Sequence, residues 1–330
     1  MRLANFIFLP ISKNKSSIAC VAILCYTYFS EMGSVRLELR NLKSFLVVAR
    51  EENITRAANL LHITQPSLSR QIMQLEDELG VKLFHRSKHS IVLTEQGRLL
   101  KRRAQEIAAL AAKAEKELSQ SDEIVSGEIS IGCGETQNME TLVRLMADFQ
   151  AEYPDVTFDI YTAVADDVKE RMESGILDMG LLLEPVEITN YNFLRMPQKE
   201  KWCLLMRTDS PLAEKTVIKA ADLVGQNLII TKRKSVKNEL ENWLGEYYDQ
   251  IKIVGTTNLS YYNRVLMVKN GLGIATCHEF QNLDSELCLR PIAPELSNGS
   301  VLIWKKAQVF SLAVEKFIDF SKGKLSTGAI

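Results

Sequence analysis

The side chains best suited to recognising a ligand in this 330-residue chain lie together between positions 64 and 70. Arginine can pair with guanine through two hydrogen bonds, glutamine can do the same with adenine, and serine suits a base or a phosphate oxygen. Thr64 is a suitable N-cap, and Pro66 fits a first helical turn, where its missing N–H leaves nothing unpaired. The segment predicts a helix whose first residues could enter a DNA major groove: Thr64, Gln65, Pro66, Ser67, Ser69 and Arg70.

Apolar residues at helical spacing predict the elements that must position this helix. A preceding helix would bury Leu39, Leu42, Phe45, Leu46 and Ala49. The next would begin with Thr55 as its N-cap and bury Ala57, Ala58, Leu60 and Leu61. The DNA-facing helix itself would bury Leu68, Ile72, Leu75 and Leu79 and end at Gly80. Apolar arms at 81–84 and 91–93 then predict a β-ribbon with Arg86 and Lys88 at its tip, where basic groups would meet phosphate or the minor groove.

Residues 37–96 resemble the winged helix-turn-helix of LysR-type transcriptional regulators. The resemblance lies in TRAANLLHITQPSLSRQIMQLEDELGVKLFHR followed by VLTEQG. It implies that Thr55 and Arg56 approach the DNA backbone and that Arg86 and Lys88 make the wing contact. The residues that it places at the groove are Gln65, Pro66, Ser67, Ser69 and Arg70. Met73 departs from the pattern, because the family often has a basic residue there, and this puts one phosphate contact in doubt.

A long helix is expected from Thr94 to about Ser119. Its apolar positions alternate four and three apart, as in the seam of a coiled coil: Leu100, Ala104, Ile107, Ala111, Ala114 and Leu118. A seam of under three heptads is also compatible with a helix that packs on its own domain. The family resemblance implies a dimer through this helix, often doubled to a tetramer, so that paired readers address paired half-sites.

The net charge of the whole chain is −1, which alone would argue against a nucleic-acid partner. The segment from Arg36 to Gln120 nevertheless has 15 Lys and Arg against 10 Asp and Glu, which makes it basic by about five charges. A modestly basic DNA-binding domain suits phosphate binding that depends on salt concentration.

The first 34 residues belong to none of the domains predicted for the rest of the chain. They include SIACVAILCYTYF, an apolar run that is too short to span a bilayer but similar to a secretion signal. Export would separate a DNA-binding domain from its DNA, so we expect a cytoplasmic protein with no stable membrane insertion. We expect the extension itself to be disordered or dispensable. A membrane tether is the alternative.

Cysteine and histidine spacing offers no catalytic or metal chemistry. The six cysteines include no Cys-x-x-Cys pair, and the four histidines show no metal-ligand spacing. The sequence has no recognisable Ser-His-Asp set, nucleophile elbow or phosphate loop, and Gly132-x-Gly134 lacks the third glycine of a dinucleotide motif. We expect neither an enzyme, nor a cofactor, nor a metal.

After Gly127 the pattern changes to alternating strands and helices, which predicts an α/β architecture. It is similar in layout to the effector-binding domain of the same family, in which two α/β lobes related to periplasmic solute-binding proteins enclose a ligand cleft. The predicted organisation is an extension (1–35), a mainly α winged helix-turn-helix (36–94), a linker or dimerisation helix with a hinge (95–126), and an effector-binding domain (127–325). Lobe I would comprise about 127–198 plus 300–322, and lobe II about 199–295.

Ligands of open α/β sheets bind beyond the carboxyl ends of the strands, against helix N-termini that favour anions. This rule selects Gly134, Glu135, Thr136 and Gln137 in the first lobe, and Thr231, Ser235, Thr257 and Asn258 in the second. The family resemblance supports Thr136. Each hydroxyl could equally be a helix cap, and the neighbouring run Lys232, Arg233 and Lys234, which hints at an anionic effector, could be a surface run.

The leading hypothesis is a homo-oligomeric regulator that binds promoter DNA in response to a small molecule, and that contacts RNA polymerase if it is an activator. The alternative from another class is an exported or membrane-tethered solute-binding protein. A third hypothesis, an enzyme fused to a DNA-binding domain, would require a set of catalytic residues that the sequence does not show.

Overall fold

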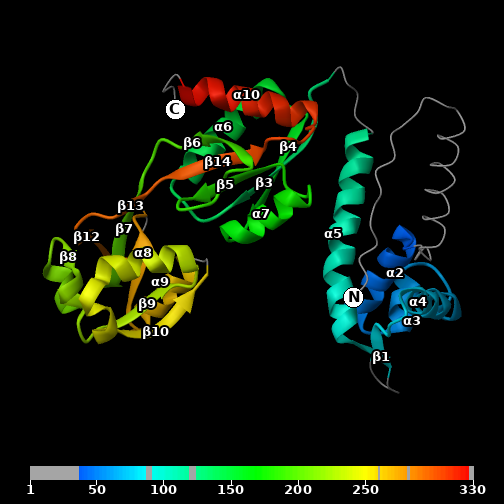
Figure 1. The fold of residues 1–330 in the computed structure, drawn as a ribbon, viewed down its shortest axis with the longest axis horizontal. Helices are drawn as coiled ribbons and strands as arrows, with labels where there is room; N and C mark the ends of the chain where they lie inside the picture. Colours follow the sequence, from blue (N-terminus) through cyan, green and yellow to red (C-terminus); the bar gives the residue numbers. More distant parts are fainter. Residues whose placement is uncertain (1–36, 87–90, 119–123, 259–260, 281–282, 327–330) are drawn as a thin grey trace, which may run out of the picture. The chain divides into compact units, whose positions relative to one another are not determined.

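The structure is a computed structural model that describes residues 37–86, 91–118, 124–258, 261–280 and 283–326 (Figure 1). The predicted extension at 1–35 and the wing residue Lys88 lie outside these ranges. The chain forms two compact units, one that ends at Ala108 and one that begins at Ala109.

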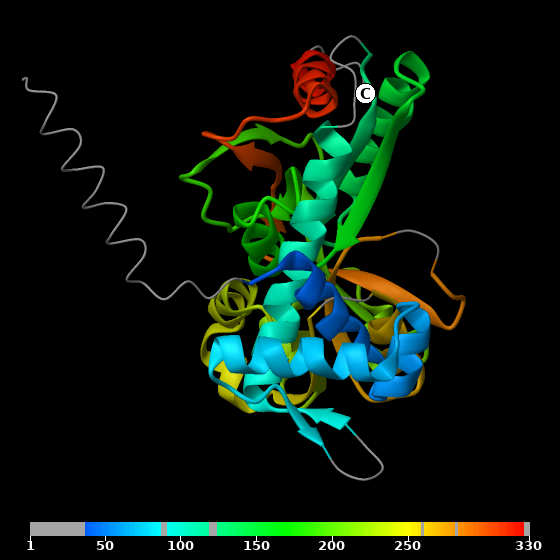
Figure 2. The same cartoon turned by 90° about the vertical axis from the view of Figure 1, so that its right-hand side faces the viewer.

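The first unit is the predicted winged helix-turn-helix (Figure 2). Its elements are α2 (Leu39–Glu51), α3 (Ile54–Leu60), α4 (Gln65–Leu79), β1 (Phe84–Arg86), β2 (Ile91–Leu93) and the first turns of α5 (Glu95–Leu118). The strands β1 and β2 are antiparallel, with Phe84 opposite Leu93. The three short helices pack around one apolar core that includes Leu42, Phe45, Ala57, Leu68, Ile72 and Leu75.

Two expectations about α3 are wrong. The N-cap is Asn53, whose side chain accepts a hydrogen bond from Arg56 N at 3.0 Å, so the helix begins one residue before Thr55. Asparagine caps a helix at least as well as threonine, and its earlier position decides the start. Leu60, the last residue of α3, is 53% exposed instead of buried.

An unexpected feature of this unit is the burial of Glu76 near the end of α4. Its side chain is 3% exposed, and Oε1 accepts hydrogen bonds from the backbone N–H groups of Leu83 at 2.9 Å and Phe84 at 3.2 Å. Lys82 adds an ion pair at 3.0 Å. Glu76 therefore fastens the first strand of the wing to the C-terminal end of α4.

The predicted seam of α5 divides into two parts. Ala104 is fully buried in the core of the first unit, and Leu100 packs against that core. Farther along, Ile107 is 41% and Leu118 is 87% exposed. The early seam residues therefore serve their own domain, and the later ones are free to contact another surface.

The second unit has two α/β lobes. Lobe I contains β3 (Gly127–Cys133), α6 (Asn138–Glu152), β4 (Val156–Thr162), α7 (Ala165–Glu173), β5 (Met179–Leu183), β6 (Tyr191–Arg195), β14 (Ser300–Lys305) and α10 (Leu312–Ser326). Its sheet has the order β4-β3-β5-β14-β6; the first three strands are parallel, and β14 is antiparallel to both neighbours.

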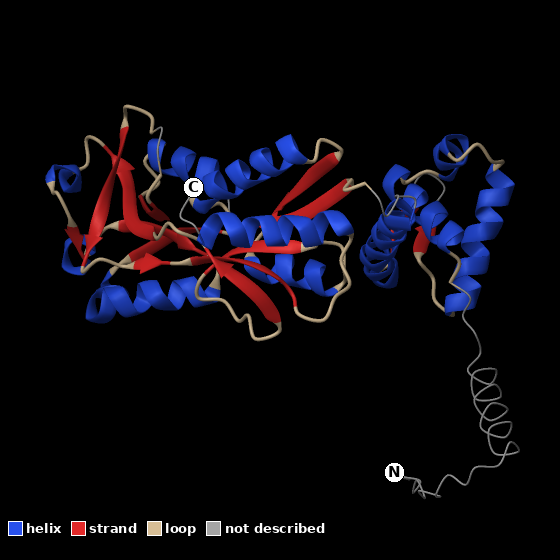
Figure 3. Cartoon of the chain, turned by 90° about the horizontal axis from the view of Figure 1, so that it is seen from above, coloured by secondary structure: helices blue, strands red, loops and turns tan. Residues whose placement is uncertain are grey.

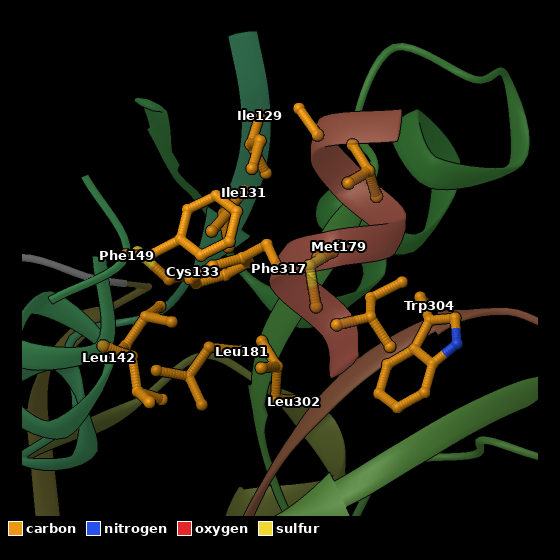
Figure 4. Close-up of a cluster of buried hydrophobic side chains, with 14 of the residues drawn as sticks. Ile129, Ile131, Cys133, Leu142, Phe149, Met179, Leu181, Leu302, Trp304 and Phe317 are labelled. Atoms are coloured by element: carbon orange, nitrogen blue, oxygen red, sulfur yellow. The ribbon is translucent and has the colours of Figure 1, made fainter. Parts of the chain in front are cut away.

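The core of lobe I lies on both faces of this sheet (Figure 3). On one face, Ile129 and Ile131 of β3 meet Phe149 of α6 and Phe317 of α10 (Figure 4). The other face is covered by α7. Gly132 permits this close packing, because a Cβ there would lie 2.5 Å from a methyl group of Val168.

Lobe II contains β7 (Glu200–Arg207), β8 (Ile218–Lys219), β9 (Asn227–Thr231), α8 (Lys234–Leu244), β10 (Lys252–Thr257), α9 (Tyr261–Lys269), β11 (Ile274–His278), β12 (Leu287–Ala293) and β13 (Ser297–Asn298), with short 3-10 helices at Pro211–Glu214, Ala220–Leu223 and Gly245–Gln250. Its sheet order is β10-β9-β11-β7-β12-β8, and β13 pairs with β7. The chain enters this lobe between β6 and β7 and leaves it between β13 and β14, so the two lobes share two crossings. None of the helices in the described ranges is both long and apolar enough to cross a membrane.

Candidate functional site

The N-terminal end of α4 presents the residues that the sequence suggested for DNA contact. Thr64 caps the helix by accepting from Ser67 N at 3.4 Å. Most of the following side chains are exposed, and Ser69 is half-buried and accepts a hydrogen bond from Gln65 at 3.1 Å. The exposed set is Gln65, Pro66, Ser67 and Arg70.

The electrostatics of this end suit an anionic partner. The first turn of α4 has no acidic residue, and the free N–H groups of a helix start carry partial positive charge. On α3, Thr55 and Arg56 are exposed, and Arg56 is held by a hydrogen bond from Nη2 to Glu51 O at 2.6 Å. Arg86 ends β1, but its side chain lies outside the described residues. The surface combines groups that can bind phosphate with groups that can read base edges.

A second candidate site is the cleft between the lobes. One cavity of about 110 Å³ and an adjoining one of about 720 Å³ share Glu135, Arg264, Cys277 and His278 in their walls. Lobe I also contributes the predicted residues Gly134, Thr136 and Gln137, and lobe II contributes Thr231 and Asn258. Thr257 is buried behind the wall, where it binds Arg264, and the side chain of Ser235 lies outside the described residues.

Arg264 on α9 is the cation at the centre of the cleft. It donates to Thr257 Oγ1 from Nε at 3.1 Å and from Nη2 at 3.0 Å, and to Thr276 O from Nη1 at 3.2 Å. These bonds use three of its five N–H groups and hold the guanidinium in place. Burial lowers the pKa of Arg264, although arginine stays charged, so the fold bears the cost of a desolvated cation.

Polar contacts join the lobes around this cation. Glu135 of lobe I accepts a hydrogen bond from Tyr261 N, at the start of α9, at 2.6 Å. Gln137 donates to the carbonyl oxygen of Glu279. From lobe II, Arg233 reaches back and donates to Leu183 O at 3.1 Å and Pro185 O at 2.9 Å. The cleft is therefore closed by groups that a ligand could replace or reinforce.

Sequence reasoning missed several residues of the cleft. Arg264 lies within a helix, and Glu200, Trp202 and His278 lie at strand positions, whereas the rule used selected only the residues that follow strands. A charged residue within an otherwise buried strand, such as Glu200 before WCLLM, is the signal that could have found one of them.

Comparison with known families decides the kinship of the chain. The model described as "Bacterial regulatory helix-turn-helix protein, lysR family" matches residues 39–98, and the model described as "LysR substrate binding domain" matches residues 123–326. The chain belongs to the LysR family.

Relatives of this LysR family protein are similar along nearly their whole length. It is 30% identical to the "Hca operon transcriptional activator HcaR" of Escherichia coli (strain K12) over 301 residues, which cover 88% of this chain and 99% of HcaR. It is 27% identical to the activator IlvY of Salmonella typhimurium over 244 residues, which cover 74% of this chain and 83% of IlvY.

Solved structures of the family have the same fold. The crystal structure of the LysR family regulator CbnR superposes with a TM-score of 0.70 at 20% identity and covers 87% of this chain and 99% of CbnR. Full-length CbnR complexed with its target DNA gives the same values. The arrangement of a helix-turn-helix followed by a two-lobed α/β domain is confirmed.

As a LysR family member, the protein is a DNA-binding transcription regulator with an effector-binding domain, and it is not an enzyme. The alternative of an exported solute-binding protein is not favoured, because a helix-turn-helix of this family precedes the bilobed domain. Within the described ranges, no three His, Cys, Asp or Glu side chains gather as metal ligands.

Proposed function

We propose that this regulator reads its operator with the N-terminal end of α4 and responds to a small organic anion that binds Arg264 in the cleft between the lobes. The proposal for the effector rests on the hydrogen-bond partners of the Arg264 guanidinium. Its guanidinium is fixed by neutral acceptors only, and no acidic side chain in the described part of the chain forms an ion pair with it.

Glu135 in the same wall favours the charged form of Arg264 without contacting it, and a desolvated cation with no direct ion pair is stabilised further by a ligand of opposite charge. The two N–H groups of Arg264 that the protein leaves unused match the geometry of a carboxylate, which arginine binds through paired hydrogen bonds. The start of α9 lies in the same wall, and its Tyr261 N–H is bonded to Glu135, a contact that a ligand anion could replace. Apolar side chains of the smaller cavity, among them Leu182, Val236 and Trp202, suit the hydrocarbon part of such an acid.

The DNA-reading assignment rests on exposed, correctly typed side chains at a capped helix start. We assign Arg70 and Gln65 to base edges, and Ser67, Ser69, Thr64, Thr55 and Arg56 to the backbone or flanking contacts. Arg86 and Lys88 of the wing complete the proposed contact set.

We further propose a homodimer, or a tetramer built from dimers, through the exposed part of α5. Leu110 and Ile107 are each more than two-fifths exposed, as is Leu118 beyond them. Covering such side chains with the same helix of another copy would remove apolar surface from water. HcaR is named an operon activator; if this chain also activates, its downstream partner would be RNA polymerase. We place the regulator in the cytoplasm, where its DNA is.

The experiment that tests the effector proposal is a thermal-shift screen of small organic acids, followed by footprinting of the bound promoter with and without the best acid. A ligand that binds only the folded state raises the melting temperature. The acid should stabilise the wild type, fail to stabilise Arg264→Gln, and alter the footprint. An acid that stabilises both proteins equally would place the anion site elsewhere, and an unchanged footprint would contradict coupling.

A further inference from the structure

Glu200, the first residue of β7, has a buried carboxylate that is only half satisfied. Its side chain is 1% exposed. Oε1 accepts hydrogen bonds from the Thr136 hydroxyl and from Asn138 Nδ2, the latter at 3.3 Å. Oε2 has no partner. A buried carboxylate oxygen without a hydrogen bond is costly, so this atom requires an explanation.

A second unpartnered atom lies in the same wall. His278 ends β11, and its ring packs on Trp202 with 4.6 Å between centroids. Its Nε2 is buried and has no hydrogen-bond partner among the described residues. A neutral imidazole has one donor and one acceptor nitrogen, so Nε2 is an acceptor in the tautomer that protonates the other nitrogen. Glu200 and His278 both line the larger cavity, beside Arg264.

The two unpartnered atoms can serve the same ligand group, because a carboxylate oxygen is an acceptor and Nε2 is one in this tautomer. A carboxylate group cannot satisfy these two atoms and, if placed there, would be repelled by Glu200. A metal ion is disfavoured, because no third ligand of suitable type joins them within the described residues. What fits is a hydrogen-bond donor, and the charge of Glu200 makes a hydroxyl or an amino group the appropriate type.

We infer that Glu200 and His278 form a donor-binding subsite in the cleft and that the effector is a hydroxy acid or an amino acid. The acid group binds Arg264; a hydroxyl donates its single proton to Glu200 Oε2 or to His278 Nε2, whereas an amino group can donate to both. This inference rests on the proposed function, because it takes the anion at Arg264 as the second anchor. It narrows the effector from any organic anion to a bifunctional one.

The test compares matched acids that differ only in the donor. Suitable sets are leucine, 2-hydroxy-4-methylpentanoate and 4-methylpentanoate, and 4-aminobenzoate, 4-hydroxybenzoate and benzoate. Titration calorimetry on the full-length protein should show that in at least one set a donor-bearing acid binds about tenfold or more tightly than its plain partner, the range expected for a hydrogen bond to a charged group. The hydroxy and amino members of that set then show which donor is preferred.

Glu200→Gln should abolish this preference, because the amide can keep the bonds from Thr136 and Asn138 but turns an N–H towards the ligand. Glu315→Gln, which makes the same charge change at an exposed position on α10, should retain the preference. Circular dichroism and the melting temperature verify that each variant folds.

The outcomes separate the two proposals. Equal affinity for the members of every set, with binding lost in Arg264→Gln, would overturn the donor subsite and leave the anion site standing; water would then fill the subsite. If no acid binds the wild type, the anion proposal itself fails, and the inference fails with it. The comparison of acids on the wild type decides the matter even if Glu200→Gln does not fold.

Discussion

Lys113 Nζ lies 2.7 Å from Asp178 Oδ1, and the two side chains are only 18% and 3% exposed. Asp178 precedes β5 and also accepts a hydrogen bond from Ser130 N of β3 at 2.9 Å. The pair joins the later turns of α5 to two neighbouring strands of lobe I. It is therefore an ion pair that holds the later turns of the linker helix to lobe I.

Removal of Lys113 should destabilise the second unit, because Lys113→Met leaves a buried carboxylate without its cation. The expected loss is about 3 kcal/mol in the free energy of unfolding, at the lower end for a broken buried pair because Lys113 is partly exposed. Urea unfolding measures it. Lys316→Met, at an exposed position of α10, is the control, and Asp178→Asn in the Lys113→Met background should recover part of the loss.

The same variant should show a defined pH dependence. Burial raises the pKa of Asp178, against the opposing effect of Lys113. The folded state then binds a proton more readily than the unfolded state, so the penalty of Lys113→Met is absent below the unfolded pKa near 3.8 and grows as the pH rises through the folded pKa. A penalty that is the same at every pH would show that Asp178 is not the group left uncompensated.

Arg70→Ala should weaken binding to the specific operator by about 1–3 kcal/mol, because a bidentate contact to a base is lost. Binding to random DNA should weaken less, since only one charge is removed. Electrophoretic mobility shifts on both DNAs measure the difference. Arg50→Ala, an exposed arginine that pairs with Glu51 at the end of α2, removes the same charge in the same unit; if it has the same effect as Arg70→Ala, then Arg70 does not read bases.

Glu76→Ala should destabilise the winged helix-turn-helix by about 2 kcal/mol or more, because two buried N–H groups of the wing lose their acceptor. Glu76→Gln retains an acceptor oxygen and should recover most of the stability. The ion pair with the exposed Lys82 contributes little, so Lys82→Ala should be nearly neutral. Thermal unfolding of the three variants tests this order.

His278 should make the protein less stable in mild acid. Burial lowers its pKa in the fold, and Glu200 raises it while Arg264 lowers it further. The unfolded state thus takes up the proton first, and stability falls as the pH drops below about 6.5, by at most about 1.4 kcal/mol per pH unit for one proton. Melting temperatures between pH 5 and 7.5 should fall less steeply for His278→Asn. His62→Asn, at an exposed left-handed position that asparagine tolerates, is the matched control substitution.

The sequence was sufficient for local structure wherever a helix start, a turn or a periodic pattern determined it. Thr64 caps α4 and Gly80 ends it at φ +67°, as their residue types require. The structural role of Glu76 could not be predicted, because its partners are backbone groups of a strand that follows a turn, and backbone donors leave no trace in the sequence. The sequence analysis did not identify Arg264 and His278 as cleft residues for a related reason. Only the folded sheet brings the middle of α9 and the end of β11 to one cavity.

The burial of Ala104 determines where the DNA-binding domain (the DNA reader) can be cut from the rest of the chain. Since this alanine is fully enclosed by the core of the first unit, a fragment cut directly after the wing would leave a hole where α5 belongs. The smallest autonomous reader must keep α5 to about Ala108, because that part of the helix completes the core of the domain.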